Sequence, residues 1–488
     1  MYDIIIFTDS LDGQRVSGAH RIADVCREQG YNTFVMQQFA EVYRRGLLFD
    51  YLDKLVGENT FMVGFSSTFF SSIESYKEDN VNGANRDAYS AINPLTAWPL
   101  PIADMDKILE YFTARNIKTV YGRFFDTGTN LLKDRVDYVI YGVGEKMMID
   151  LIDHVRNGKK IPFDALSTGR PKVLKYDSKG TLFNFKTSQS RYEPWDLIDH
   201  HDMLHLEIAR GCIFNCKFCG YPLIGKRKDD DSYTRTKEVL KAELKENYEK
   251  YGVTRYHIVD DTFNEKTEKV KMLAEAVEET GVKIDFAWAY VRIELLHKYP
   301  EQLDYLYRAG VRMLRFGLES LNWESAKAIG KGLHPDKIKE TLAWIQQKYP
   351  GHFVSSCSFI IGLPHDTEET VSEWLEWVYQ HPELIQETAF HPLSLQTEED
   401  HGEWTSEFGR NYEDYGYNVV KGLGWINDHW SERQVNEFLE KKRLEFGKKY
   451  NRLSALGRDS KEPKLIKQRR DENLEFYMTK LKNYMDSL

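Results

Sequence analysis

The run ARGCIFNCKFCGYP, residues 209–222, holds three of the five cysteines of this chain within eight positions. The three are Cys212, Cys216 and Cys219, in the spacing CxxxCxxC. A cubane iron–sulfur cluster needs four ligands, so a loop that supplies three thiolates leaves one iron open to a further ligand. The spacing therefore predicts an iron–sulfur cluster with one open coordination position.

A structural zinc site is the alternative, because His200, His201 and His205 each offer a fourth ligand. Zinc ligands usually come in pairs with two residues between them, and the first gap here is three residues. The spacing favours the cluster. Gly220, directly after the last cysteine, lets the backbone approach a bound group closely.

Length and charge restrict the other classes of function. A chain of 488 residues is expected to form two or three domains. The net charge of -10 argues against nucleic acid as a partner. The chain begins without a basic segment and holds no apolar run of membrane-spanning length, and its clustered cysteines do not form a disulfide framework. We therefore expect a cytoplasmic protein with no membrane span.

Residues 1–156 alternate apolar runs with amphipathic segments, which predicts a Rossmann-like domain, a doubly wound parallel sheet. Its predicted strands are Asp3–Thr8, Asn32–Gln37, Phe61–Ser66, Lys118–Gly122 and Asp137–Tyr141, and its predicted helices are Gly18–Gly30, Tyr43–Val56 and Asp104–Asn116. Residues 157–203 are interpreted as a linker with a small irregular hairpin.

Residues 204–398 contain six strand–helix units, which predict a partial (β/α)6 barrel with its site at the carboxyl ends of the strands. The predicted strands are Leu204–Ala209, Tyr256–Val259, Asp285–Tyr290, Met313–Gly317, Val354–Ile361 and Glu387–Leu395. Residues 399–488 are expected to be mostly helical, and their mixed charges favour a solvated helix face over a nucleic-acid patch. Overall the fold class is α/β.

The cysteine loop, with the aromatic Phe218 just before its last cysteine and a strand before it, resembles the radical S-adenosylmethionine superfamily. The resemblance implies that Cys212, Cys216 and Cys219 hold a [4Fe–4S] cluster and that S-adenosylmethionine chelates the fourth iron. One electron, from a reductant such as flavodoxin or ferredoxin, then passes through the cluster and cleaves the sulfonium of S-adenosylmethionine, which gives methionine and a 5′-deoxyadenosyl radical. That radical abstracts hydrogen from a small-molecule substrate.

Four later motifs match the same family, one strand at a time. In HIVDDTF (257–263), Asp260 or Asp261 is implied near the methionine amino group. The run Phe286–Arg292 resembles the third strand of the family, and its Arg292 is implied to bind the methionine carboxylate. In RFGLES (315–320), Glu319 is placed near the ribose or methionine, and in FIIGLP (359–364), Gly362 lets the backbone contact adenine. The competing interpretations are a helix cap for the aspartate and a surface ion pair for Arg292.

The N-terminal domain resembles the cobalamin-binding-type domain that precedes this barrel in one branch of the family. This chain departs from the branch, because the run DSLDGQ (9–14) has a leucine where the Asp-x-His-x-x-Gly motif has its axial histidine. His20 is interpreted as a helix residue and not as a ligand. Cobalamin binding is therefore left open.

The remaining cysteines, Cys26 and Cys357, are too few for a second cluster, which disfavours methylthiolation, and Cys357 is interpreted as core packing. The leading hypothesis is cobalamin-assisted methyl transfer to an unactivated carbon. The alternatives are a cobalamin-independent radical oxidation, cyclisation or rearrangement, and a non-catalytic metal-binding scaffold. The aromatic runs 82–101 and 404–430 are either covers of the barrel mouth or domain-interface packing, and no catalytic residue is assigned.

Overall fold

The structure is a computed structural model of the whole chain, and it describes the following residues: 1–9, 15–66, 72–73, 100–123, 131–163, 170–175, 183–220, 233–395, 397, 405–420, 424–450 and 463–488. The chain divides into two compact units. Unit 1 is Met1–His205, Asn247–Val253 and Lys464–Leu488, and unit 2 is Leu206–Glu246 and Thr254–Pro463. Three sites of the sequence predictions lie outside the described residues. They are Leu11, which stands at the place of the axial histidine, the aromatic run from 82 to 99, and Trp404.

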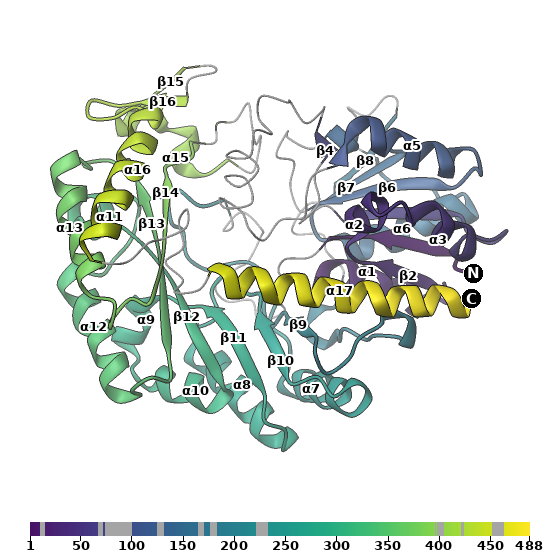
Figure 1. Cartoon of the computed structure of the whole chain (residues 1–488), viewed down its shortest axis with the longest axis horizontal. Helices are drawn as coiled ribbons and strands as arrows, with labels where there is room; N and C mark the ends of the chain where they lie inside the picture. The colour runs from purple at the N-terminus through teal and green to yellow at the C-terminus, as the bar shows by residue number, and fades with distance from the viewer. Residues whose placement is uncertain are drawn as a thin grey trace. The chain divides into compact units, whose positions relative to one another are not determined.

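Unit 1 is built on a six-stranded parallel sheet in the order β2-β1-β3-β6-β7-β8 (Figure 1). Its strands are β1 (Ile4–Phe7), β2 (Thr33–Met36), β3 (Met62–Ser66), β6 (Lys118–Arg123), β7 (Tyr138–Tyr141) and β8 (Lys172–Lys175). After β1 the chain adds β2 on one side of it, and then adds β3, β6, β7 and β8 in turn on the other side. The sheet therefore has a topological switch point beside β1, where open α/β sheets bind ligands. This confirms the predicted doubly wound architecture.

The sheet is covered on both faces, as strand β1 shows. Ile5 and Phe7 belong to one apolar core, and Ile4 and Ile6 belong to the other. Because successive side chains of a strand point to opposite faces, a continuous apolar run is what a doubly covered strand requires. The helices of this unit are α1 (Ser17–Glu28), α2 (Phe39–Arg44), α3 (Leu48–Leu55), α5 (Ile102–Thr113), α6 (Gly144–Asn157) and α17 (Pro463–Ser487).

Three elements of unit 1 differ from the sequence expectation, and the first is the predicted helix Tyr43–Val56, which is divided into α2 and α3. Strand β8 lies where an irregular hairpin was expected, and it pairs in parallel with β7. Its run KVLK is short and half exposed, as an edge strand can be, so it lacks the apolar signal of the inner strands. Helix α6 was not predicted, because the glycines at 142 and 144 resemble a turn.

The C-terminal helix α17 is part of unit 1, although most of the chain, including all of unit 2, lies between it and the first strands in the sequence. Tyr477, Met478, Leu481 and Met485 enter the core that holds Phe34 and Met36 of β2, and Figure 1 shows the helix beside β2. Polar contacts support the same placement, since Lys480 Nζ donates to the Leu197 oxygen at 2.7 Å and to Asp199 Oδ2 at 2.9 Å. The helix for which a solvated charged face was predicted therefore also has an apolar face, and that face is buried in the core of unit 1.

Unit 2 contains a second six-stranded sheet, in the sequential order β14-β13-β12-β11-β10-β9. Helices α8, α10, α12 and α13 lie along one side of it (Figure 1). The strands are β9 (Met203–Leu206), β10 (Arg255–Ile258), β11 (Asp285–Tyr290), β12 (Val311–Glu319), β13 (Val354–Ile361) and β14 (Glu387–Pro392). The helices are α7 (Lys237–Tyr251), α8 (Thr267–Thr280), α9 (Ile293–Lys298), α10 (Glu301–Ala309), α11 (Trp323–Ala328), α12 (Pro335–Lys348) and α13 (Glu368–Gln380). All six predicted strands are confirmed.

Residues after β14 form α15 (Glu407–Arg410), the hairpin β15 (Asn418–Val420) and β16 (Gly424–Ile426), and α16 (Glu432–Lys449). The minor elements are β4 (Ser72–Ile73), β5 (Leu100–Pro101), η2 (Leu131–Asp134), η4 (Phe185–Thr187), η5 (Pro194–Asp196) and η8 (Tyr412–Tyr415). Within the described helices, none is both long and apolar enough to span a membrane.

Candidate functional site

The cysteine loop leaves β9 and is held at its start by residues 233–235. The Arg210 N–H donates to the Tyr233 oxygen at 3.1 Å, and the Arg235 N–H donates to the Ile208 oxygen at 2.9 Å. Between the cysteines, the Cys219 N–H closes a turn on the Cys216 oxygen at 3.0 Å. All three cysteines are half-buried.

Two other segments hold the middle of the loop. The Lys217 N–H donates to the Ile329 oxygen at the end of α11 at 3.1 Å, and the Phe408 N–H donates to the Lys217 oxygen at 2.8 Å. Gly330 has φ +81°, and a Cβ there would lie 3.6 Å from the Asn215 oxygen. The loop conformation therefore depends on α11 and on α15, far along the chain.

The sulfurs of the loop have polar neighbours. Thr262 Oγ1 lies 3.4 Å from Cys212 Sγ, and Arg292 Nη1 donates to Cys216 Sγ at 3.2 Å. The thiolate is the form of cysteine that binds metal, and N–H donors to sulfur tune iron–sulfur clusters. The donor set of the loop thus fits a cluster that takes three thiolates.

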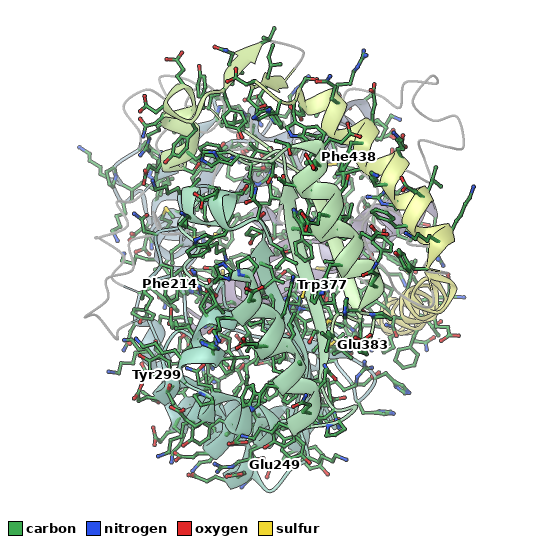
Figure 2. All side chains as sticks on the ribbon, turned by 90° about the vertical axis from the view of Figure 1, so that its left-hand side faces the viewer. Phe214, Glu249, Tyr299, Trp377, Glu383 and Phe438 are labelled. Carbon is green, nitrogen blue, oxygen red and sulfur yellow. The ribbon has the colours of Figure 1, made fainter. Side chains whose placement is uncertain are left out.

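Arg292 is oriented by several contacts at the end of β11. Its Nη2 donates to Glu294 Oε1 at 2.8 Å, and its guanidinium lies 4.1 Å from the centre of the Phe214 ring, labelled in Figure 2. The Asn264 side chain bonds both the N–H and the oxygen of Arg292, at 2.8 and 3.1 Å. Arg292 is therefore fixed beside the cysteine loop. Its contact with a methionine carboxylate stays a prediction.

Glu319 lies at the end of β12, with φ 66°, and is buried. Lys331 Nζ lies 3.8 Å from Glu319 Oε1 and donates to the Gly317 oxygen at 2.7 Å. Burial raises the pKa of Glu319, and the charge of Lys331 opposes that rise. Burial alone would raise the pKa of Glu294 too, but Lys331 and Arg292 hold it below its usual range.

Asp260, at the end of β10, already has strong partners within the protein. Its Oδ1 accepts from the backbone N–H groups of Ile208 and Ala209, at 2.7 and 3.0 Å, and its Oδ2 accepts from Lys269 Nζ at 3.0 Å. Burial raises the pKa of Asp260, and Lys269 opposes the rise. Oδ1 thus fixes the chain just after β9, three residues before the first cysteine, and Lys269 holds the carboxylate through Oδ2. A contact with the methionine amino group remains a prediction.

Gly362, at the end of β13, has φ +92°, and a Cβ there would lie 2.5 Å from the Trp425 ring. Its N–H donates to Asp366 Oδ2 at 3.1 Å, and its oxygen accepts from the Tyr417 hydroxyl at 2.6 Å. Glycine is required at position 362 because the Trp425 ring packs against its Cα, where a side chain would clash. The predicted contact with adenine is untested. Phe218 and Gly220 are both half-buried in the cysteine loop.

Sequence reasoning missed several residues of this region: Thr262, Asn264, Lys269, Glu294 and Lys331. Glu294 and Lys331 had a weak signal, since one stands two residues after Arg292 and the other stands between two glycines. The others are ordinary residues of a loop and a helix, and only the fold shows their role.

At the switch point of unit 1, Asp9 follows β1 and is fully buried. Its Oδ1 accepts only a long bond from the Ala40 N–H, at 3.4 Å, and its Oδ2 has no partner in the described structure. Burial raises the pKa of Asp9 to about 7. An orphaned buried oxygen at the ligand-binding edge fits a polar ligand such as cobalamin.

His20 is buried in α1, as its interpretation as a helix residue requires. Its Nε2 lies 3.3 Å from Gln37 Oε1, and its Nδ1 lies 3.5 Å from Asp196 Oδ1. Asp199, His200 and His201 bring three metal-type ligand atoms within 4.8 Å of one another, and Asp199 is already bound by Lys480. Among the described residues, the three cysteine sulfurs form no such compact group.

Comparison with known proteins agrees with this geometry. Residues 206–378 match the family model described as the radical SAM superfamily, so the chain carries a radical SAM domain. The match implies a [4Fe–4S] cluster and S-adenosylmethionine as cofactors.

Among curated relatives, an uncharacterised methyltransferase of Pyrococcus horikoshii is 25% identical over 50% of this chain and 52% of its own length. The ribosomal protein methylthiotransferase RimO of Chloroherpeton thalassium is 28% identical over 44% of this chain and 51% of its own length. The chain thus spans about half the length of these relatives.

The methyltransferase TsrM of Kitasatospora setae, solved with cobalamin and a [4Fe–4S] cluster, has the same fold, with a TM-score of 0.61 and 14% identity. The similarity covers 86% of this chain and 82% of that one. The predicted order, a doubly wound sheet followed by the radical SAM sheet, is confirmed.

The buried lysine of α8 should be necessary for the folded loop. In Lys269→Met the carboxylates of Asp260 and Glu265 lose their cation, and we expect unfolding to become easier by about 3–5 kcal/mol. Lys271→Met, on the same helix at a position 52% exposed, should cost less than about 1 kcal/mol. Chemical denaturation measures both, and equal costs would contradict the role of Lys269.

The carboxyl of Asp9 should make the stability of unit 1 depend on pH. Its folded pKa is raised to about 7, above the ordinary 3.8, so the folded state keeps a proton that the unfolded state releases. Stability should fall as pH rises between about 4 and about 7, by at most about 4 kcal/mol. Asp9→Asn should lessen this loss, whereas Asp50→Asn, at an exposed position, should not. Thermal unfolding at about pH 5 and about pH 8 tests the difference.

Proposed function

We propose that this protein is a radical S-adenosylmethionine enzyme that modifies an unactivated carbon by cobalamin-assisted methyl transfer. The observation that carries the proposal is the cysteine loop itself. Three half-buried cysteines lie in a loop held on both sides, and Arg292 donates to one of their sulfurs. When bound, the cluster and S-adenosylmethionine supply a 5′-deoxyadenosyl radical.

The residues of the chain have separate tasks in this proposal. Cys212, Cys216 and Cys219 hold the cluster. Arg292, already fixed by Glu294 and Asn264, presents a guanidinium of planar geometry to the methionine carboxylate. Glu319 has its carboxylate at the strand end beside Lys331, where it accepts from the ligand. A one-electron reductant such as flavodoxin or ferredoxin is the expected partner.

Cobalamin has support from two observations. The fold of TsrM, whose solved structure contains cobalamin, covers 86% of this chain and so includes the doubly wound sheet. Asp9 leaves a buried oxygen without a partner at the switch point of that sheet. In the proposal, Asp9 offers a polar contact to the corrinoid, since Leu11 stands in the place of the axial histidine.

That leucine also favours the second candidate, a cobalamin-independent radical oxidation, cyclisation or rearrangement. Methylthiolation has less support, although RimO is among the relatives. The free cysteines outside the loop are Cys26 and Cys357, both buried, and burial raises the pKa of Cys26 to about 12. Buried thiols of this kind are inert, so they are poor ligands for a second cluster.

Removal of a cluster cysteine should abolish S-adenosylmethionine cleavage. After anaerobic reconstitution, the protein should show a broad visible absorbance and should form 5′-deoxyadenosine on reduction. Cys212→Ala, Cys216→Ala and Cys219→Ala should each reduce both signals to background. Cys357→Ala, in the core, should keep both and lose about 1 kcal/mol of stability. A colourless wild-type protein that binds zinc would mean a scaffold and not an enzyme.

Hydroxocobalamin should distinguish the two enzymatic candidates. We expect the purified protein to retain the corrinoid through gel filtration and to shift its visible spectrum, because the switch-point edge offers a site. A cobalamin-free protein that still forms 5′-deoxyadenosine would support the second candidate and exclude the methyl transfer.

A further inference from the structure

Among the described residues of unit 2, helices α8, α10, α12 and α13 cover one face of the sheet (Figure 1), and the contacts of α13 show which side chains point to that face. Phe359 stacks on Trp374 of α13, with ring centres 5.1 Å apart, and Phe390 lies 6.2 Å from Tyr379 of the same helix. Phe359 and Phe390 are register partners, so both point toward α13. Because side chains alternate along a strand, the residues between them point to the opposite face.

Four polar residues form one row across that opposite face. The register pairs Tyr290 with Arg315, Arg315 with Ser356, and Ser356 with Glu387. We call these four residues the inner row. Ser356 is three positions before Phe359, and Arg315 and Glu387 share its face, because paired residues in a parallel sheet project to the same side. The inner row thus crosses β11, β12, β13 and β14.

Arg315 is the one cation of the row, and its contacts are weak. Its guanidinium lies 5.0 Å from the centre of the Trp288 ring, and Nη1 lies 3.3 Å from the Tyr290 hydroxyl. Within the described part of the chain no carboxylate forms an ion pair with it. Arginine has five N–H donors in a fork that matches a carboxylate, so most of its bonding capacity is unused inside the protein.

Glu387, the other charged residue of the row, forms no ion pair with Arg315 in the described structure. It lies two strands from Arg315, a separation of about 10 Å between backbones. The guanidinium also turns the other way, toward Trp288 and Tyr290 on β11. Both charged residues are half-buried. A half-buried cation without a carboxylate gains more from an anionic ligand than a surface arginine does.

The next row toward the strand ends has small side chains on β13 and β14, where Ser358 pairs with Ala389. On β12 the same row begins with Gly317, and the Glu319 carboxylate occupies the space where a Cβ of Gly317 would lie. The row lies about 7 Å from the inner row and on the side of Glu319. A ligand that contacts Arg315 would therefore extend over small residues toward the strand ends that carry the proposed cofactor site.

We propose that the inner row is the substrate-binding surface, and that Arg315 binds a carboxylate of the substrate. The substrate class is a small organic acid whose apolar part lies over Ser358 and Ala389. That the bound acid is the substrate rests on the proposed function. The binding step itself is independent of turnover.

The test uses pairs of probes that differ in one group. Benzoate and benzamide, indole-3-acetate and indole-3-acetamide, and N-acetyltryptophan and its amide are titrated into the reconstituted protein with S-adenosylmethionine. Calorimetry and ligand-observed NMR measure binding. At least one carboxylate should bind about tenfold more tightly than its amide, and Arg315→Gln should remove that preference.

Two further variants make the test specific. Arg312→Gln is the matched control, because Arg312 lies on the same strand but contacts His352 and Asp285. It should keep the preference. Arg315→Lys keeps the charge without the planar fork, so it should give an intermediate preference for the carboxylate. If Arg315→Gln does not fold, Arg315→Lys still tests the role of the guanidinium. The proposal is wrong if no carboxylate binds more tightly than its amide, including when nothing binds, or if Arg315→Gln keeps the preference.

The formation of 5′-deoxyadenosine is measured in parallel on the same samples. Carboxylate preference without this product would overturn the proposed function and leave the site intact. Product without carboxylate preference would overturn the site and leave the proposed function intact.

Discussion

The buried carboxylate of Asp260 connects the radical SAM sheet to its cysteine loop. It accepts the last N–H groups of the chain leaving β9 and is held in turn by Lys269. Lys269 also donates to the Thr262 oxygen at 3.0 Å, and the Thr262 hydroxyl lies beside Cys212. One ion pair thus fixes where the loop begins and what stands next to its first sulfur. A buried pair of this kind adds little to net stability, but it costs several kcal/mol to break, so it specifies geometry.

Charged side chains of both signs lie at this edge, and the cations oppose the rise in pKa that burial causes in the carboxyl groups beside them. Arg292 bonds Glu294, and Lys331 acts on both Glu294 and Glu319. A bound amino acid group with its own carboxylate and ammonium would enter a site that already contains both signs of charge. The two signs of charge already balance one another in part within the protein.

The sequence predicted every strand of the two six-stranded sheets except β8, because each of the others is a run of mostly apolar residues, whereas β8 is short and half exposed. It predicted that Cys212, Cys216 and Cys219 act together because they are adjacent in the chain. It did not predict contacts whose partners are far apart, such as Trp425 at Gly362 or Phe408 on Lys217. No local pattern marks these residues, since their role depends on which loops meet at the carboxyl ends of parallel strands.

For Asp260 the sequence predicted the position of the residue but not its hydrogen-bond partners. The motif at 257–263 placed an acidic residue at the strand end, and the structure has one there, but its two oxygens already bond three donors of the protein. A carboxylate that must hold two backbone N–H groups and a buried lysine cannot turn toward a ligand without leaving those donors unpaired, at about 1–3 kcal/mol each. The neighbouring charged residues of the edge, Glu319 and Arg292, lack this obligation to the backbone. Asp260 therefore has a structural role at the strand ends, because its oxygens already accept from three donors of the protein. The hydrogen bonds show this difference from Glu319 and Arg292, and the motif alone does not.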